Sequence, residues 1–165
     1  SQSVLITADA AYAQAVQDGV DALLAVSPRA QYLAAALAQR GAIIITRDLD
    51  EAAQMANLLA PEHLELAVAQ PHRLLPAIRH AGSILLGGHS PVPVGDYFAG
   101  PSHILPTGRT ARFSSGLGVL DFLTRSSLIG VAPLWLDQSG DAIVTLAEHE
   151  GLDGHAEAIR KRMER

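Results

Sequence analysis

The hydrophobic pattern of the chain predicts short strands that alternate with helices. Three nearly continuous apolar runs are typical of strands that are covered on both faces of a parallel sheet. Between them, apolar residues recur at the spacing of one helix face, and Asp48 stands where the N-cap of one such helix is expected. We expect strands at 4–6, 42–45 and 84–86, and apolar helix faces at Tyr12, Val16, Val20 and Leu23, at Leu33 and Leu37, at Leu49, Ala53, Ala56 and Leu59, and at Leu74, Leu75 and Ile78.

This order predicts an α/β fold, a three-layer sandwich on a mainly parallel, Rossmann-like and incomplete sheet with right-handed crossovers. Prolines and glycines in the loop 87–116 are expected to break any regular element, and a loop of that length is usually functional. A further strand is expected at 127–131. Two helices should follow, one from about Ser139 to His149 and one from about Asp153. We therefore divide the chain into the C-terminal half of a Rossmann-like domain over 1–131, which includes the loop, and a helical tail over 132–165.

The composition excludes several classes of function. Hydrophobic residues make up 48% of the 165 residues and charged residues 18%, as in globular chains. The net charge of −5 lacks the basicity of most nucleic-acid binders, and no apolar stretch is long enough to span a bilayer. We therefore expect a cytoplasmic protein with no nucleic-acid or membrane partner. Cysteine is absent, so a metal site would have to use histidine and carboxylate ligands.

The chain starts with Ser-Gln-Ser and enters a strand-like run at once, without an initiator methionine. This start is typical of a chain cut from a longer one, and we expect a fragment. A small domain whose first strand lies at its terminus is the alternative.

Three groups of residues could carry chemistry. Glu62 and His63 follow a predicted helix end at Pro61 and offer two acid/base groups on a loop, although a surface pair is the simpler interpretation. Asp96 and His103 lie between glycines in the long loop and are good Zn²⁺ ligands, or else a turn residue and a solvated histidine. Glu150 and His155 bracket Gly151, where His155 would lie in the first turn of the last helix and be held neutral, or simply pack on its apolar stripe.

Other motifs are missing or ambiguous. No Gly-x-Gly-x-x-Gly follows a strand, so this segment has no recognisable residues for binding a dinucleotide cofactor. A P-loop and a Gly-x-Ser-x-Gly elbow are also absent. The segment 107–112 is similar to a phosphate-contacting loop, but a solvated loop is the simpler interpretation.

Longer motifs resemble one enzyme family. Residues 60–65, Ala-Pro-Glu-His-Leu-Glu, look like the Pro-Glu-His segment of histidinol dehydrogenases. Residues 95–108 and 110–115 are similar to the signature loop of that family, which 121–123 and 126–129 continue. Glu148, Glu150, Gly151, Leu152 and His155 look like its C-terminal element. The resemblance covers essentially the whole chain, in order.

The resemblance implies oxidation of L-histidinol to L-histidine through histidinal, with two NAD⁺ and one Zn²⁺ per active site, in a homodimer that exchanges its tails. Glu62 would activate water and His63 would transfer protons. Asp96 and His155 would bind the metal. The substrate contacts implied are His63, Asp96, His103, Glu150 and His155.

This chain departs from the family at its front, because the NAD contacts and two further zinc ligands of the family precede the first strand. We therefore expect the 165 residues alone to be inactive. A non-catalytic remnant that dimerises or binds metal is the alternative, and a zinc hydrolase is a third hypothesis.

Overall fold

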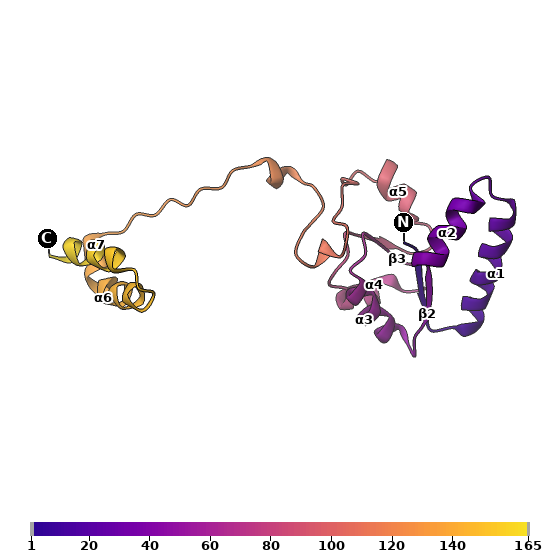
Figure 1. Ribbon diagram of the computed structural model, residues 1–165, viewed down its shortest axis with the longest axis horizontal. Coiled ribbons are helices and arrows are strands. Elements are labelled where there is room, and N and C mark those ends of the chain that lie inside the picture. Colours follow the sequence, from indigo (N-terminus) through magenta and orange to yellow (C-terminus); the bar gives the residue numbers. More distant parts are fainter. Residues whose placement is uncertain (1, 165) are drawn as a thin grey trace. The chain divides into compact units, whose positions relative to one another are not determined.

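Two pairs of parallel strands carry the α/β part of the chain, as the computed structural model of residues 2–164 shows (Figure 1). β1 (Val4–Thr7) pairs with β2 (Ala42–Ile45), and β3 (His63–Leu66) pairs with β4 (Ser83–Leu86). The expected α/β class and the parallel pairing are confirmed. The helical connections are α1 (Ala10–Val26) and α2 (Ala30–Arg40) between β1 and β2, α3 (Leu49–Leu59) between β2 and β3, and α4 (Pro71–Leu74) with a 3₁₀ turn (Leu75–Ala77) between β3 and β4.

Aspartate side chains fix the starts of α1 and α3. Asp9 Oδ1 accepts hydrogen bonds from two N–H groups of the first turn of α1, at 2.9 and 3.0 Å. Asp48 Oδ1 accepts the N–H of Glu51 at 2.8 Å, which confirms the predicted N-cap. This bond, together with the neighbouring Arg47 guanidinium, lowers the pKa of Asp48 below its usual value.

Small side chains let α3 approach the strands closely. Ala52, Ala53 and Ala56 are buried on this helix, and α3 packs against β1. Leu66 of β3 and Leu85 of β4 are the buried large residues of the strands. The apolar spacing predicted the inward face of α3 correctly at Ala53 and Ala56, but it was wrong at Leu49, which is 46% exposed.

The segment around residues 60–97 contains two elements that the sequence analysis missed. β3 forms where only a loop was expected. The prediction rested on the proline before Glu62 and His63 and did not take into account the β4 backbone with which β3 pairs. α5 (Val92–Tyr97) forms inside the supposed irregular loop. Pro93 lies in its first turn, where a missing N–H costs no hydrogen bond within the helix.

The expected strand at 127–131 is wrong, since these residues have neither helix nor strand. Their apolar content alone does not make a strand, because the backbone needs a neighbouring strand to pair with. Leu128 and Ile129 are almost fully exposed. The helix expected from Ser139 starts earlier, as α6 (Pro133–His149), with Pro133 at its first position.

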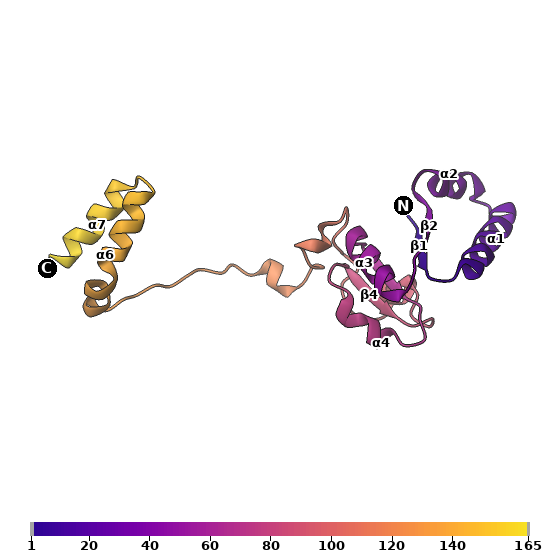
Figure 2. The ribbon, with the colours of Figure 1, turned by 90° about the horizontal axis from the view of Figure 1, so that it is seen from below.

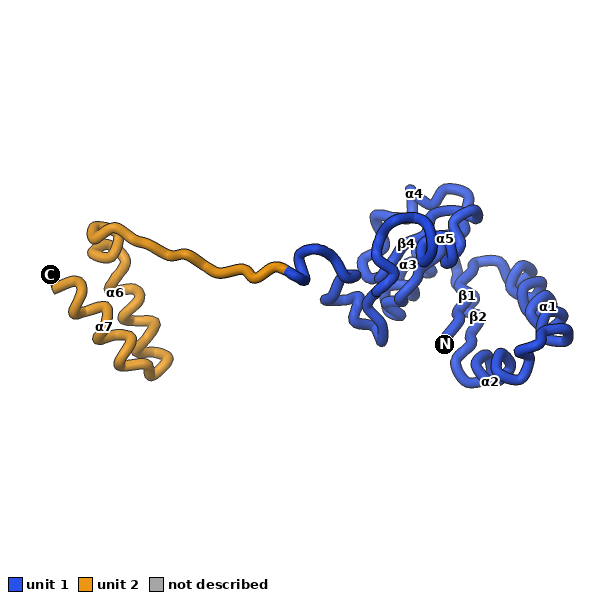
Figure 3. Tube along the Cα trace, turned by 90° about the horizontal axis from the view of Figure 1, so that it is seen from above, with its two compact units in different colours: residues 1–122 blue, residues 123–165 orange. Residues whose placement is uncertain are grey.

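The chain divides into two compact units, the first ending at Phe122 and the second starting at Leu123 (Figure 3). In the second unit, α6 and α7 (Asp153–Met163) form a helical hairpin (Figure 2). Gly151 has a φ of +71°, which suits glycine at the reversal. The buried residues of the hairpin are Val144, Ala147 and Ala156, with Ile159 packed against them. Within residues 2–164 we find no helix of the length and apolarity required to span a membrane.

Candidate active site

A sharp chain reversal delivers Glu62 and His63 to the start of β3. α3 ends at Leu59, and Ala60 adopts the left-handed conformation with a φ of +46° while its N–H bonds to the Ala56 carbonyl. Such a φ is uncommon without glycine, so the surrounding structure has to hold it. Pro61 follows and prevents the helix from continuing, as its position in the sequence predicts.

The backbone of this reversal is held by the segment that precedes β4. The Gly82 N–H donates to the Pro61 carbonyl at 2.9 Å, and the Ser83 N–H donates to the Glu62 carbonyl at 2.8 Å. A Cβ atom at Gly82 would lie 2.6 Å from the Glu62 carbonyl oxygen. Glycine is therefore required for this close approach, and the position of Glu62 depends on it.

Two arginines from the loop after α5 hold the end of α3. Arg109 and Arg112 both donate through Nη2 to the Leu58 carbonyl, at 2.7 and 2.5 Å. Cations at a helix C-terminus satisfy its free carbonyls and interact favourably with the helix dipole. Sequence reasoning could not assign this role to the segment 107–112, because the acceptor lies more than fifty residues earlier in the chain.

His63 and Asp96 meet although 33 residues separate them. His63 Nε2 lies 3.2 Å from Asp96 Oδ1, and their side chains are 20% and 33% exposed. His63 is the first residue of β3, whereas Asp96 belongs to α5. The pair therefore joins an imidazole and a carboxylate that the sequence analysis had placed in separate motifs.

A large cleft lies beside Glu62 and His63. Its volume is about 1120 Å³, and Glu62, His63 and Arg109 line it together with residues of β1 and α3. The exposed Glu62 carboxylate is accessible to a ligand in the cleft. His103 is exposed on the segment that follows α5, and the structure does not join it to the His63–Asp96 pair.

Glu150 and His155 lie in the second unit, beside the turn of the helical hairpin. Both side chains are exposed. Glu150 caps the end of α6, and the Leu152 N–H closes the turn by bonding to the Ala147 carbonyl at 2.8 Å. The neighbouring Glu148 forms an ion pair with Arg160.

The donor chemistry fits zinc, but the ligand set is incomplete. Asp96 and His155 offer the oxygen and nitrogen ligands that Zn²⁺ accepts, and Asp96 Oδ2 is not used in the contact with His63. Across residues 2–164, no three His, Cys, Asp or Glu side chains gather closely enough to hold a metal ion. Residues outside this set would have to complete a zinc site.

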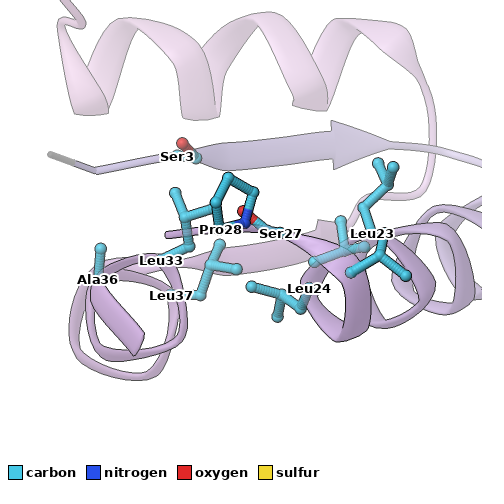
Figure 4. Close-up of a pocket in the computed structure, with 10 residues that line it drawn as sticks. Ser3, Leu23, Leu24, Ser27, Pro28, Leu33, Ala36 and Leu37 are labelled. Carbon is cyan, nitrogen blue, oxygen red and sulfur yellow. The ribbon is translucent and has the colours of Figure 1, made fainter. Parts of the chain in front are cut away.

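A second, apolar cavity of about 490 Å³ lies between α1 and α2 (Figure 4). Leucines of both helices line it, among them Leu24 and Leu37, and polar groups come only from Ser3 and Ser27. It holds no titratable side chain and none of the candidate catalytic residues. The apolar faces at Leu23, Leu33 and Leu37 were predicted, but not that they would leave a cavity.

Comparison with known proteins identifies the family. A family model described as histidinol dehydrogenase matches residues 1–163. The chain belongs to the histidinol dehydrogenase family.

Individual members of the histidinol dehydrogenase family agree with this assignment. The chain is 48% identical to histidinol dehydrogenase of Rhizobium meliloti (strain 1021), over 99% of the chain and 38% of the relative. It is 49% identical to that of Bordetella parapertussis (strain 12822), over 99% of the chain and 37% of the relative. The crystal structure of histidinol dehydrogenase from Elizabethkingia anophelis superposes with a TM-score of 0.82 at 32% identity, over 99% of this chain and 38% of that one. The chain thus spans less than two fifths of the length of these histidinol dehydrogenases.

Proposed function

We propose that this chain supplies part of the active site of a histidinol dehydrogenase, which oxidises L-histidinol to L-histidine through histidinal with two NAD⁺. The observation that carries the proposal is the contact between His63 and Asp96, two residues that the family motifs mark as functional. The structure brings them together from different elements, and Glu62 directly precedes His63 in the chain. The family match does not favour the alternative of a non-catalytic remnant.

The roles of the chain's own residues follow from their chemistry. In the tautomer that donates Nε2–H to Asp96, His63 has Nδ1 free to accept the proton of the substrate alcohol. The exposed Glu62 takes a proton from the water that adds to the histidinal carbonyl. The resulting hydrate carries the hydroxyl that the second oxidation needs.

For the metal, we propose that Asp96 and His155 contribute two ligands. When bound, zinc would orient the substrate by its imidazole and amine groups. His103 and Glu150 would contact the substrate. For NAD⁺, which accepts the hydride in both oxidations, the chain has no recognisable contact.

We further propose a cytoplasmic homodimer in which the second unit completes the partner's site. The segment 123–131 before α6 supports this, because its apolar side chains are exposed, with Leu128, Ile129 and Val131 at 101%, 84% and 51%. Such side chains are expected to be covered in the assembled enzyme. Glu150 and His155 would then act on the neighbouring copy.

A chimera tests the catalytic proposal. In it, this chain replaces the segment that it matches in the Rhizobium meliloti enzyme, and NADH formation from L-histidinol is recorded. We expect an active chimera, and Glu62→Gln, His63→Ala and Asp96→Asn should each lower kcat by roughly 10²–10⁴-fold, as is typical when an acid/base group is lost. The 165-residue chain without the rest of the enzyme should form no NADH.

Controls of the same chemical type are available on the surface of the first unit. Asp18→Asn and His72→Ala change exposed residues outside the candidate site and should leave turnover unchanged. Full turnover in all three site variants would refute the assigned roles. A folded chimera that never forms NADH would instead favour the non-catalytic remnant.

A further inference from the structure

Glu65 lies on the same side of β3 as His63. Side chains two residues apart in a strand point to the same face, so His63 and Glu65 project together while Leu64 and Leu66 project to the other face. Leu66 is buried at 5% exposure, which identifies its side as the interior. Glu65 is an exposed carboxylate beside the imidazole of the candidate site.

The Glu65 carboxylate holds the first residue of α5. Glu65 Oε1 accepts the N–H of Val92 at 2.8 Å. The first N–H groups of a helix have no partner within it, and here the N-cap residue, Pro91, offers no side-chain acceptor. Glu65 therefore caps α5 from a different element, 27 residues earlier in the chain.

This cap and the His63–Asp96 contact form a two-point clamp. Val92 and Asp96 are four residues apart in a helix, about 6 Å along its axis. Glu65 and His63 are two residues apart in a strand, about 6.6 Å along it. Because the two spacings match, both contacts form at once, with α5 running opposite to β3.

The chain on either side of α5 gives the helix little support. Gly87 and Gly100 flank it with positive φ values of +81° and +99°. The helix itself packs against β4, where a Cβ at Gly95 would be 3.5 Å from the Leu85 side chain. A single contact at Asp96 would let α5 pivot, and the second contact at Val92 restricts that rotation.

We propose that Glu65 is a positioning residue, which holds α5 so that the Asp96 carboxylate faces His63 with one oxygen and leaves the other for a ligand. The link to catalysis rests on the proposed function, but the clamp itself does not. Glu65 acts through Asp96, because its carboxylate holds the helix that carries this residue.

Nuclear magnetic resonance on the 165-residue chain tests the clamp directly. We expect Glu65→Ala to lower the hydrogen-exchange protection of the Val92 amide by roughly tenfold, the typical effect of losing one cap bond. It should also shift the ¹⁵N signals of the His63 ring toward those of Asp96→Asn, in which the carboxylate partner is lost. Glu65→Gln keeps an acceptor oxygen and should restore both signals.

Glu51→Ala is the matched control, because Glu51 also accepts one backbone N–H through its carboxylate, that of Arg47 at 2.6 Å. It should leave the Val92 and His63 signals unchanged. The proposal is overturned if Glu65→Ala leaves those signals as they are, or if Glu51→Ala changes them equally.

The chimera supplies the second readout. Glu65→Ala should lower kcat roughly tenfold, with rescue by Glu65→Gln, since the loss is one of orientation. Unchanged kcat in Glu65→Ala, with the clamp signals lost, would overturn the role in positioning. An unsubstituted chimera without activity would refute the proposed function and leave the clamp to be judged by the resonance data alone.

Discussion

The two units hold their candidate site residues in different ways. In the first unit, Glu62 and His63 depend on contacts between distant parts of the chain, from the β4 backbone and from α5. In the second unit, Glu150 and His155 lie on either side of one tight turn between two helices. Local hydrogen bonds within that turn fix their spacing.

This difference indicates how sensitive each part of the site is to substitutions elsewhere in the chain. A hairpin with local contacts carries its two side chains as a preformed pair, so their mutual geometry is insensitive to changes elsewhere. The His63–Asp96 pair exists only when β3, β4 and α5 are all in place. A change at a backbone contact in the first unit should therefore cost more than a comparable change in the hairpin.

The largest expected effect is the recovery of activity in a mixed dimer, in which one subunit carries a defect in its first unit and the other subunit carries a defect in its second unit. If His155 acts on the partner's site, a chimera with Glu62→Gln and one with His155→Ala are each inactive alone. Co-expressed, they should regain NADH formation, because each mixed dimer holds one site with both residues intact. Activity is measured on mixed dimers purified through two different affinity tags.

Co-expression of Glu62→Gln with His63→Ala is the control for this exchange. Both residues lie in the first unit, but each mixed dimer then carries one defect in every site, so no activity should return. Failure of the Glu62→Gln and His155→Ala pair to regain activity would show that the second unit serves its own subunit.

The second-largest effect is expected on the stability of the first unit, at the backbone contact between Gly82 and Glu62. Gly82→Ala should destabilise this unit by roughly 1–3 kcal/mol, because its Cβ would lie 2.6 Å from the Glu62 backbone oxygen, which cannot turn away as a flexible side chain can. Urea unfolding recorded by tyrosine fluorescence measures it, since Tyr12, Tyr32 and Tyr97 all belong to this unit. Gly88→Ala is the control, with nothing within 4 Å of the new Cβ. Equal midpoints for both variants would contradict the prediction.

The smallest effect is expected in the hairpin. A Cβ at Gly140 would overlap Met163 Sδ, but this atom belongs to a flexible side chain that can turn away. Alanine also gains about 1 kcal/mol over glycine within a helix, so Gly140→Ala should change the stability by less than about 1 kcal/mol. Fluorescence of Trp135, the single tryptophan, reports on this unit. A loss of unfolding free energy as large as that for Gly82→Ala would contradict the proposed ranking.

Local signals made much of the fold predictable. Three apolar runs marked β1, β2 and β4, and Asp48 marked the start of α3. β3 was not predicted, because its four residues, His-Leu-Glu-Leu, have a weak strand pattern and follow closely after a proline. α5 was not predicted either, because Pro93 and Gly95 lower the helix propensity of this segment. Contacts with β3 and β4 offset this low propensity in the structure.

The sequence alone determined the identities of the candidate groups, because the motifs at 60–65 and 95–108 are long and specific. It also determined where α3 stops, since Pro61 acts on its immediate neighbour. Tertiary structure alone decided that Asp96 faces His63, that Glu65 caps α5, and that Arg109 and Arg112 hold the Leu58 carbonyl. These contacts join residues 27 to 54 positions apart. The spacing of residues along the chain does not show that two such residues lie close together in space, because they meet only after the strands have paired.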